Sequence, residues 1–484
     1  MTENTPGRIH RRTVVAGAAW TIPVVATAIG APLAAASGGE PTLAFTNGPY
    51  AVAACGTLTD VVITATADGT KPVTSGTPIT VTLPSGLKWS DGSTGTKTLF
   101  TDGNGQVVLS GVKASGTNGT RTITASANGL QTSAPVTASG ATSLITVSNG
   151  SNYNVSLPPL PAGVTAQDLQ YTLNNGGKRT LWVLGSDGKA YINVDGAATW
   201  QTNTAGTATL IATANDGTGT AAVLESSGLI TVTNGSNYNV ALPPLPAGVT
   251  AQDLQYTLNN GGKRTLWVLG SDGKAYINVD GEPTWQTNTA GTATTIAVAN
   301  GGTGTAAVLE SSGLITVTNG SNYNVSLPPL PAGVTAEDLQ YTVNNANKRT
   351  LWVLGSDGKA YINVDGEPTW QTNTAGTATL VALAEQGTGT AAVLESSGLI
   401  TVTNGSNYNV SLPPLPAGVT AQDLQYTINN ANKRTLWVLG SDGKAYINVD
   451  GEPTWQTNTA GTATTIATAN DGTGTAAIAE QQAC

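Results

Sequence analysis

The sequence predicts an all-β protein in two parts, a β-sandwich followed by an eight-bladed β-propeller. Its 484 residues include 59 glycines and 24 prolines, while only 10% are charged, against about 25% in a typical soluble domain. No stretch has the apolar spacing or the Ala-, Leu-, Glu- and Lys-rich composition of helices. Short β-branched runs alternate instead with Gly-containing turns, and from residue 144 the sequence repeats every 85 residues.

Residues 1–36 are predicted to be an export signal peptide rather than part of the fold. Arg11 and Arg12 precede an apolar, uncharged stretch over residues 13–30, and residues 34–36 (AAA) form a small-residue cleavage site. Residues 10–15 (HRRTVV) resemble a twin-arginine export signal. The alternative is a transmembrane anchor, which the prolines and glycines of the stretch disfavour. We therefore expect a protein that is secreted or held at the cell surface, with no membrane span in the mature chain.

Residues 40–138 are predicted to form one β-sandwich. Asp-Gly and Asn-Gly dipeptides separate its β-branched runs, and both favour hairpin turns because they tolerate positive φ. Five such runs in about 100 residues match the size of an immunoglobulin-like sandwich. The predicted strands cover residues 58–67, 78–83, 96–101, 106–112 and 120–127.

Three segments of this region resemble bacterial immunoglobulin-like domains of the invasin and intimin type. They are residues 71–83 (KPVTSGTPITVTL), 101–107 (TDGNGQV) and 121–125 (RTITA). The resemblance implies an exported bacterial protein in which this domain is an extracellular spacer or an adhesion module.

The region 139–484 is predicted to be a β-propeller because each copy of its repeat contains two related halves. Residues 222–232 (AVLESSGLITV) align on residues 182–192 (WVLGSDGKAYI), and each predicts a strand, a glycine turn and a strand. The halves are 40 to 45 residues apart, the size of one four-stranded blade. Four copies therefore predict eight blades. The copies are residues 144–228, 229–313, 314–398 and 399–484.

The two ends of the array predict a closed ring. The first half-copy begins at Leu144 without the strand that precedes its siblings, and residues 475–480 (TAAIAE) match residues 220–225 (TAAVLE). A C-terminal strand that pairs into the first blade would complete that blade and remove an exposed edge. An open stack would carry polar capping repeats at both ends instead.

The chain has two cysteines, Cys55 in the predicted sandwich and Cys484 at the last position. Two cysteines in an oxidising compartment often pair, and ring closure would bring Cys484 near residue 140, where the sandwich attaches. A disulfide between Cys55 and Cys484 is therefore expected. Two free thiols or an intermolecular bridge are the alternatives.

Residues 181–194 (LWVLGSDGKAYINV) and their copies resemble the repeats of tachylectin-type and chromosome-condensation-regulator-type propellers. In those families a hydrophobic strand, an Asp-Gly turn and a second strand recur around the ring. The Trp-Gly-x-Asn and Gly-Gln-Leu-Gly signature of the second family is absent from this chain, so nucleotide exchange is not implied. The resemblance implies a lectin-like role.

Two sets of repeated tryptophans have different expected roles. The first set lies within apolar strands and is predicted to be blade core; it comprises Trp182, Trp267, Trp352 and Trp437. The second set lies in Trp-Gln-Thr-Asn segments, where a ring face and amide groups suit a sugar. Packing between blades is the alternative. The predicted ligand contacts are Trp200, Gln201, Asn203, Trp285, Gln286, Asn288, Trp370, Gln371, Asn373, Trp455, Gln456 and Asn458.

Composition argues against several classes of function. A net charge of −9 without clustered Lys or Arg argues against nucleic acid as a partner. The one histidine is His10 and the cysteines form no CxxC pair, so no metal site and no cofactor are expected. Catalysis needs an asymmetric set of differently tuned groups. Near-identical repeats supply the same groups around a ring, so we expect no enzyme.

The expected function is multivalent binding or adhesion, by a monomer whose partner is an extracellular glycan or a surface protein. Four near-identical sites would raise avidity above the affinity of one site. The alternatives are a structural repeat protein of the cell envelope and a propeller glycan hydrolase or lyase.

Overall fold

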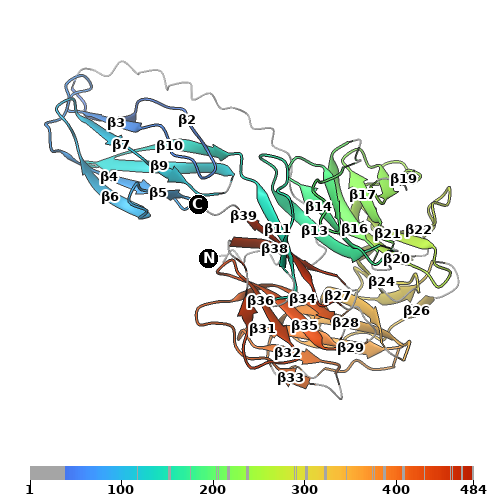
Figure 1. Ribbon diagram of the computed structural model, residues 1–484. Helices are drawn as coiled ribbons and strands as arrows, with labels where there is room; N and C mark the ends of the chain where they lie inside the picture. Colours follow the sequence, from blue (N-terminus) through green and yellow to red (C-terminus); the bar gives the residue numbers. More distant parts are fainter. Residues whose placement is uncertain are drawn as a thin grey trace. The chain divides into compact units, whose positions relative to one another are not determined.

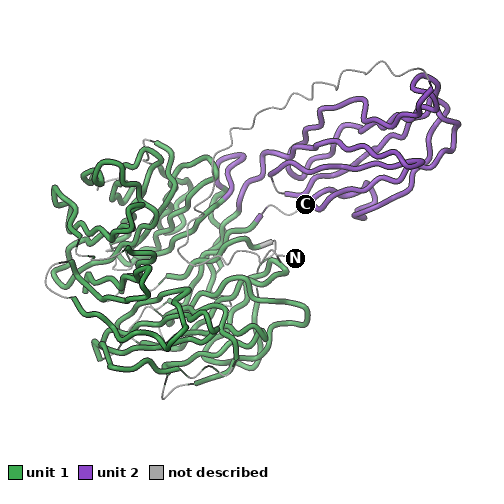
Figure 2. The backbone as a smooth tube through the Cα atoms, turned by 180° about the vertical axis from the view of Figure 1, so that it is seen from behind, with its two compact units in different colours: residues 1–16, 144–159, 166–480 green, residues 17–143, 160–165, 481–484 purple. Residues whose placement is uncertain are grey.

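The computed structural model describes residues 39–481 apart from short gaps, and its secondary structure there is entirely β-strand. No helix able to cross a membrane occurs in these residues. The predicted signal peptide lies outside them. The described residues divide into two compact units (Figure 2), residues 39–143, 160–165 and 481 in one and residues 144–159 and 166–480 in the other. The gaps are residues 117, 151–153, 175, 203, 205, 215–217, 236–238, 288, 290–291, 300–302, 321–323, 345, 373, 375, 385–387, 406–408, 430, 458, 460–461 and 470–472.

The first unit contains two main sheets and a short ribbon. In sheet order, the first main sheet consists of β1 (Thr42–Phe45), β3 (Val61–Thr66) and β7 (Gln106–Leu109). The second consists of β2 (Tyr50–Ala53), β10 (Leu130–Ser139), β9 (Gly119–Ala127), β4 (Pro78–Leu83) and β6 (Gly95–Phe100). The ribbon pairs β5 (Leu87–Lys88) with β8 (Lys113–Ala114). The five predicted strands are confirmed as β3, β4, β6, β7 and β9.

One apolar core lies between the two main sheets, which makes this unit a β-sandwich. Alternate residues of β3 point inward, as the period of two in a strand requires. Val61 and Ile63 of β3 and Ile79 and Ile123 of the other sheet are fully buried in one cluster. The described part of the chain holds no free cysteine and includes Cys55. Cys484 lies outside it, so the pairing of the two cysteines stays a prediction.

The described residues beyond the sandwich form eight further sheets of three or four strands. The first three are β13 (Ala166–Leu173), β14 (Arg179–Gly185) and β15 (Ala190–Val194); β16 (Ala208–Thr213), β17 (Ala221–Glu225), β18 (Ile230–Thr233) and β19 (Asn239–Ala241); and β20 (Ala251–Leu258), β21 (Arg264–Gly270) and β22 (Ala275–Val279). The next two are β23 (Ala293–Val298), β24 (Ala306–Glu310), β25 (Ile315–Thr318) and β26 (Asn324–Ser326); and β27 (Ala336–Val343), β28 (Arg349–Gly355) and β29 (Ala360–Val364).

The remaining three sheets include the one that joins the two ends of the repeat array. Two are β30 (Ala378–Leu383), β31 (Ala391–Glu395), β32 (Ile400–Thr403) and β33 (Asn409–Ser411); and β34 (Ala421–Ile428), β35 (Arg434–Gly440), β36 (Ala445–Val449) and β37 (Gln456–Thr457). The last has the order β12 (Asn154–Ser156), β11 (Ser143–Ser148), β39 (Ala476–Gln481) and β38 (Thr462–Thr468). The C-terminal strand β39 therefore pairs with β11, as the sequence predicts.

One strand from each of these sheets contacts its counterpart in the next, and the contacts form a closed cycle. The cycle runs β13, β16, β20, β23, β27, β30, β34 and β38, and β38 also contacts β13. Figure 1 shows the sheets following one another around a common centre. Successive antiparallel sheets in such a cycle make the region a β-propeller.

The tryptophans of the LWVL strands are the largest fully buried side chains of the propeller. Each is at most 1% exposed, and each indole Nε1 donates a hydrogen bond of 3.1–3.2 Å to a glycine carbonyl in the second half of the same copy. The prediction that they are core is therefore confirmed. The pairs are Trp182 with Gly219, Trp267 with Gly304, Trp352 with Gly389, and Trp437 with Gly474.

Candidate ligand site between the blades

The second set of tryptophans is half-buried and fixed in place. Each follows an Asp-Gly turn whose aspartate has φ of 56–57°, a left-handed conformation that Asp adopts more readily than most residues. Each indole Nε1 donates a 2.8 Å hydrogen bond to a proline carbonyl at the start of a Leu-Pro-Pro-Leu-Pro stretch. The pairs are Trp200 with Pro158, Trp285 with Pro243, Trp370 with Pro328, and Trp455 with Pro413.

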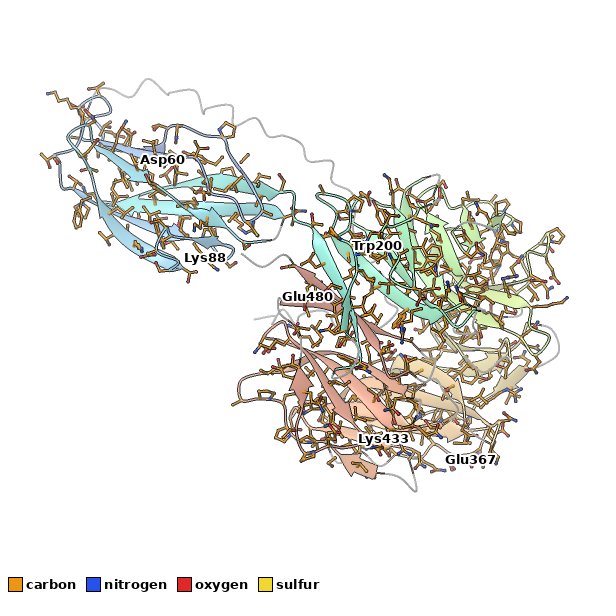
Figure 3. The ribbon with its side chains drawn as sticks, in the orientation of Figure 1. Asp60, Lys88, Trp200, Glu367, Lys433 and Glu480 are labelled. Carbon is orange, nitrogen blue, oxygen red and sulfur yellow. The ribbon has the colours of Figure 1, made fainter. Side chains whose placement is uncertain are left out.

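Part of the tryptophan ring packs against the core, as the alternative interpretation of these residues expects. Trp285 packs against a cluster that contains Leu242 and Tyr256, and Trp370 packs against the equivalent cluster of the next copy. Those clusters join strands of one sheet to strands of the following sheet. The rings are nonetheless only partly buried, so each presents some aromatic surface to solvent. Figure 3 labels Trp200 and Glu367 on the propeller.

The glutamines of the predicted site are exposed and anchored through their backbone. Gln201 exchanges two hydrogen bonds with Ile192, which adds a short edge to the sheet of β13–β15. The same pairing recurs at Gln286 and Gln371, and in the fourth copy Gln456 lies in β37. The four predicted asparagines, Asn203, Asn288, Asn373 and Asn458, lie outside the described residues.

The site also contains three carboxylates that the sequence-based prediction did not include. The amide Nε2 of Gln286 donates a 2.8 Å hydrogen bond to Glu282. The equivalent bonds, Gln371 to Glu367 and Gln456 to Glu452, are 2.9 Å long. The first copy has Ala197 at this position. The sequence signal was available, because this slot varies between copies whereas the Trp-Gln segment does not.

A small pocket adjoins the Trp-Gln segment in the third copy. It is lined by Val317, Val325 and Leu327 of one sheet and by Tyr341, Arg349, Leu351, Asn363, Asp365 and Gly366 of the next. Leu327 directly precedes Pro328, which holds the Trp370 indole, and Gly366 directly precedes Glu367. Two residues that line the pocket are therefore chain neighbours of residues that hold or flank the predicted contacts. The pocket's cavity volume is about 10 Å³, about the room that one water molecule needs.

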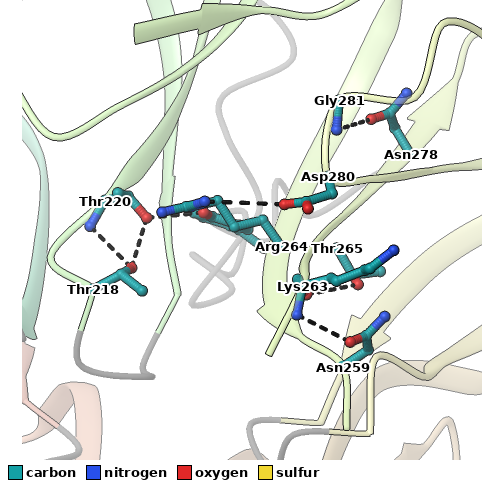
Figure 4. Close-up of polar contacts among 10 residues, drawn as sticks. Thr218, Thr220, Asn259, Lys263, Arg264, Thr265, Asn278, Asp280 and Gly281 are labelled. Carbon is teal, nitrogen blue, oxygen red and sulfur yellow. Dashed lines mark hydrogen bonds and ion pairs between the residues drawn. The ribbon is translucent and has the colours of Figure 1, made fainter. Parts of the chain in front are cut away.

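Buried asparagines shape the turn beside this pocket. Asn363 is 1% exposed, and its Nδ2 donates a 2.8 Å hydrogen bond to the carbonyl of Glu367. Its Oδ1 accepts a 3.0 Å hydrogen bond from Gly366. Figure 4 shows the matching residues of the second copy, where Asn278 holds Gly281 and the Arg264 Nη1 lies 3.9 Å from the Asp280 Oδ1.

The site combines an apolar wall with a polar rim. Val317, Val325 and Leu327 supply the wall. The guanidinium of Arg349 supplies donors and Asp365, 3.8 Å away, supplies acceptors. Together these groups offer an apolar surface beside both hydrogen-bond donors and acceptors. Among the described residues, no three His, Cys, Asp or Glu side chains gather in a way that could hold a metal ion.

Comparison with known proteins found likenesses in solved structures. No family model matches the chain, and no curated protein matches it. The chain resembles the Dos1 propeller (12% identity, TM-score 0.41, covering 66% of this chain and 79% of that one). It also resembles YCF48 from Cyanidioschyzon merolae, with 15% identity and a TM-score of 0.39 over 66% of this chain and 96% of that one. A third likeness is AztD from Citrobacter koseri, with 9% identity and a TM-score of 0.43 over 65% of this chain and 94% of that one. The propeller assignment rests on the chain's own sheets and their cycle of contacts.

Proposed function

We propose that this is a secreted or surface-held carbohydrate-binding protein with one sugar site in each repeat of its propeller. One observation carries the proposal. In every copy a half-buried tryptophan is fixed by a hydrogen bond from its indole nitrogen, and in the third copy this segment adjoins a pocket between two sheets. A fixed ring loses little freedom on binding, which favours affinity.

The chemistry of the site suits a sugar better than a large or strongly charged ligand. A sugar ring has an apolar face, which an aromatic ring can cover, and hydroxyl groups at its edge, which amides, carboxylates and a guanidinium can bind. The pocket's volume of about 10 Å³ is about the room that one water molecule needs. A sugar would therefore lie on the exposed face of the tryptophan and reach the pocket with at most a small substituent.

Repetition favours binding over catalysis. Each copy presents the same aromatic ring and glutamine, and near-identical sites around a ring suit multivalent binding better than glycoside hydrolysis, which uses one pair of differently tuned carboxylates. Repeated weak sites gain avidity when a surface displays many copies of the ligand. A surface glycan is therefore the partner that this arrangement serves best.

The rest of the chain supports display of such a head outside the cell. We infer an eight-bladed ring, supported by the closed cycle of contacts among eight sheets. We infer that the sandwich is an immunoglobulin-like spacer, supported by its two sheets around one core. A twin-arginine export signal over residues 1–36, a monomeric state and a Cys55–Cys484 disulfide complete the proposal.

The test is a glycan array probed with the mature protein, residues 37–484. The proposal expects binding to a limited set of glycans, and loss of that binding when Trp200, Trp285, Trp370 and Trp455 are all changed to Ala. Lys433→Ala, an exposed residue in a different turn, is the matched control and should bind as the wild type does. A folded wild type that binds no glycan would favour the structural envelope alternative.

A further inference from the structure

We infer that the four sites fall into two classes, and that Glu282, Glu367 and Glu452 restrict three of them to uncharged sugars. This inference rests on the proposed function and deepens it. The carboxylates are specificity-determining groups in the second, third and fourth copies. The first copy has Ala197 at that position. Its site therefore lacks the carboxylate and differs from the other three.

The first argument is that the carboxylate fixes the glutamine beside the tryptophan. In three copies the glutamine amide donates to the glutamate at 2.8–2.9 Å. The amide is therefore oriented before any ligand arrives, and the glutamate keeps acceptor capacity because a carboxylate has about four lone-pair sites. In the first copy Gln201 lies next to the same tryptophan without that partner.

The second argument is that the residues of the turn differ, although its backbone hydrogen bond is 3.1 Å long in all four copies. Copies two to four have Glu-Pro where the first has Ala197-Ala198. Proline fixes its own φ and holds the residue before it extended, so Glu282, Glu367 and Glu452 sit in a preset backbone. In these copies the asparagine Oδ1 accepts a 3.0 Å hydrogen bond from the turn glycine. In the first copy the Oδ1 of Asn193 is buried without a hydrogen-bond partner.

The third argument is the chemistry that a carboxylate selects. It accepts hydrogen bonds from sugar hydroxyls, and bonds to an ionised acceptor are stronger than neutral ones. It also repels a ligand that carries its own carboxylate, which is selection by disfavouring the wrong partner. Uronates and other acidic sugars should therefore be rejected by the three Glu-containing sites. Neutral hexoses should be accepted.

The experiment counts sites by calorimetry with the mature protein, using neutral disaccharides (cellobiose, maltose and lactose) and disaccharides that end in glucuronate. The wild type should bind four equivalents of a neutral disaccharide in two classes, three tighter sites and one weaker site. The double variant Ala197→Glu with Ala198→Pro should bind four equivalents in one class. The triple variant Glu282→Gln, Glu367→Gln, Glu452→Gln should bind the neutral sugar at least tenfold more weakly and bind the glucuronate sugar more tightly than the wild type does.

The control is Glu337→Gln, which removes one exposed negative charge at a position where the other copies already have glutamine. It should leave stoichiometry and affinity unchanged. Four equivalent sites in the wild type, or unchanged selectivity in the triple variant, would overturn the division into classes while leaving the proposed function standing. If the wild type binds none of these sugars and no glycan on the array, the proposed function and the inference both fail.

Discussion

The hydroxyl oxygens of Tyr171 and Thr475 lie 3.0 Å apart and share a buried hydrogen bond across 304 residues of sequence. The same tyrosine–threonine bond occurs three more times, at 2.8–2.9 Å, between residues only 36 apart. A contact that elsewhere links consecutive sheets therefore also links the first and last parts of the array. The internal pairs are Tyr256 with Thr220, Tyr341 with Thr305, and Tyr426 with Thr390.

Removal of this hydrogen bond and of its counterpart inside the array should change the free energy of unfolding equally. The two changes should differ in their effect on local amide hydrogen exchange. Tyr171→Phe and Tyr256→Phe should each lower the free energy of unfolding by about 1 kcal/mol, the usual net value of one hydrogen bond. Urea denaturation measures this. Only Tyr171→Phe should speed amide hydrogen exchange in β11 and β39, because only this bond lies where the ends meet. A Tyr171→Phe protein with wild-type stability and exchange would show that closure does not depend on this contact.

Removal of the closing strand should destabilise the whole propeller. Truncation after residue 472 removes β39 and leaves both β11 and β38 with an unpaired edge, which invites aggregation. We expect a lower and broader thermal transition and concentration-dependent light scattering. Truncation after residue 481 keeps β39 and is the control for loss of the C-terminus alone. An unchanged transition in the shorter protein would argue against a closed ring.

The repeat made most of the propeller predictable, whereas parts of the sandwich were not. The LWVL tryptophans were correctly predicted as core because an apolar strand recurs with them in each copy. In the sandwich, β1 and β2, which have four residues each, were not predicted. β10 was missed as well, since it contains Pro135, a residue that usually argues against a paired strand.

The site could be predicted only in part, because several of its residues are far apart in the sequence and are brought together by the fold. The sequence placed Trp370 and Gln371 together since they are neighbours. The pocket is also lined by Leu327 and Arg349, which come from two different sheets. No local sequence pattern predicts that these two residues lie close together. The partly buried hydrogen bond from the Trp370 indole to the Pro328 carbonyl spans 42 residues. It likewise follows from the packing of one sheet on the next.

The tyrosines that donate to the aspartates of the Ser-Asp-Gly-Lys turns predict a fall in stability at high pH. Burial, together with a 2.6 Å hydrogen bond to Asp272, raises the pKa of Tyr276 to about 12. The pKa of Tyr361 and that of Tyr446 are raised to about 12 in the same way. A raised folded-state pKa gives stability that is complete below the unfolded pKa of about 10 and is lost as pH rises toward 12. We expect each tyrosine to contribute roughly 2–3 kcal/mol to that loss.

Denaturation by urea at pH 8, 10 and 11 measures this effect. Tyr276→Phe should be less stable than the wild type at pH 8, because a partly buried hydrogen bond to the Asp272 carboxylate is lost, and should lose less stability between pH 10 and 11. The same pairs predict an acid limb. Although partial burial raises the pKa of Asp272, hydrogen bonds from Tyr276 and Lys274 hold it below its usual range, so its stabilisation should fade below about pH 4. A flat profile from pH 8 to 11 would contradict the assigned tyrosine shifts.

The two cysteines should be joined in secreted protein. Peptide mapping without reduction should recover Cys55 linked to Cys484, and Cys484→Ser should leave Cys55 reactive toward a thiol reagent in the unfolded protein. A loop that spans almost the whole mature chain should stabilise by several kcal/mol in the chain-entropy model, since that term grows with loop length. The melting temperature under reducing conditions should drop accordingly. Freshly secreted protein with two free thiols would refute the pairing.

A comparison of Trp285 with Trp267 decides between ligand contact and packing. Trp267 is fully buried, so Trp267→Ala should lower the free energy of unfolding by about 3–5 kcal/mol, as for other large core truncations. Trp285 is half-buried, and Trp285→Ala should cost clearly less, because part of the ring already faces water. Binding of the glycan found on the array should lose one site in Trp285→Ala while the remaining sites keep their affinity. If Trp285→Ala destabilises as much as Trp267→Ala and every site survives in the folded fraction, Trp285 is a packing residue and does not contact a sugar.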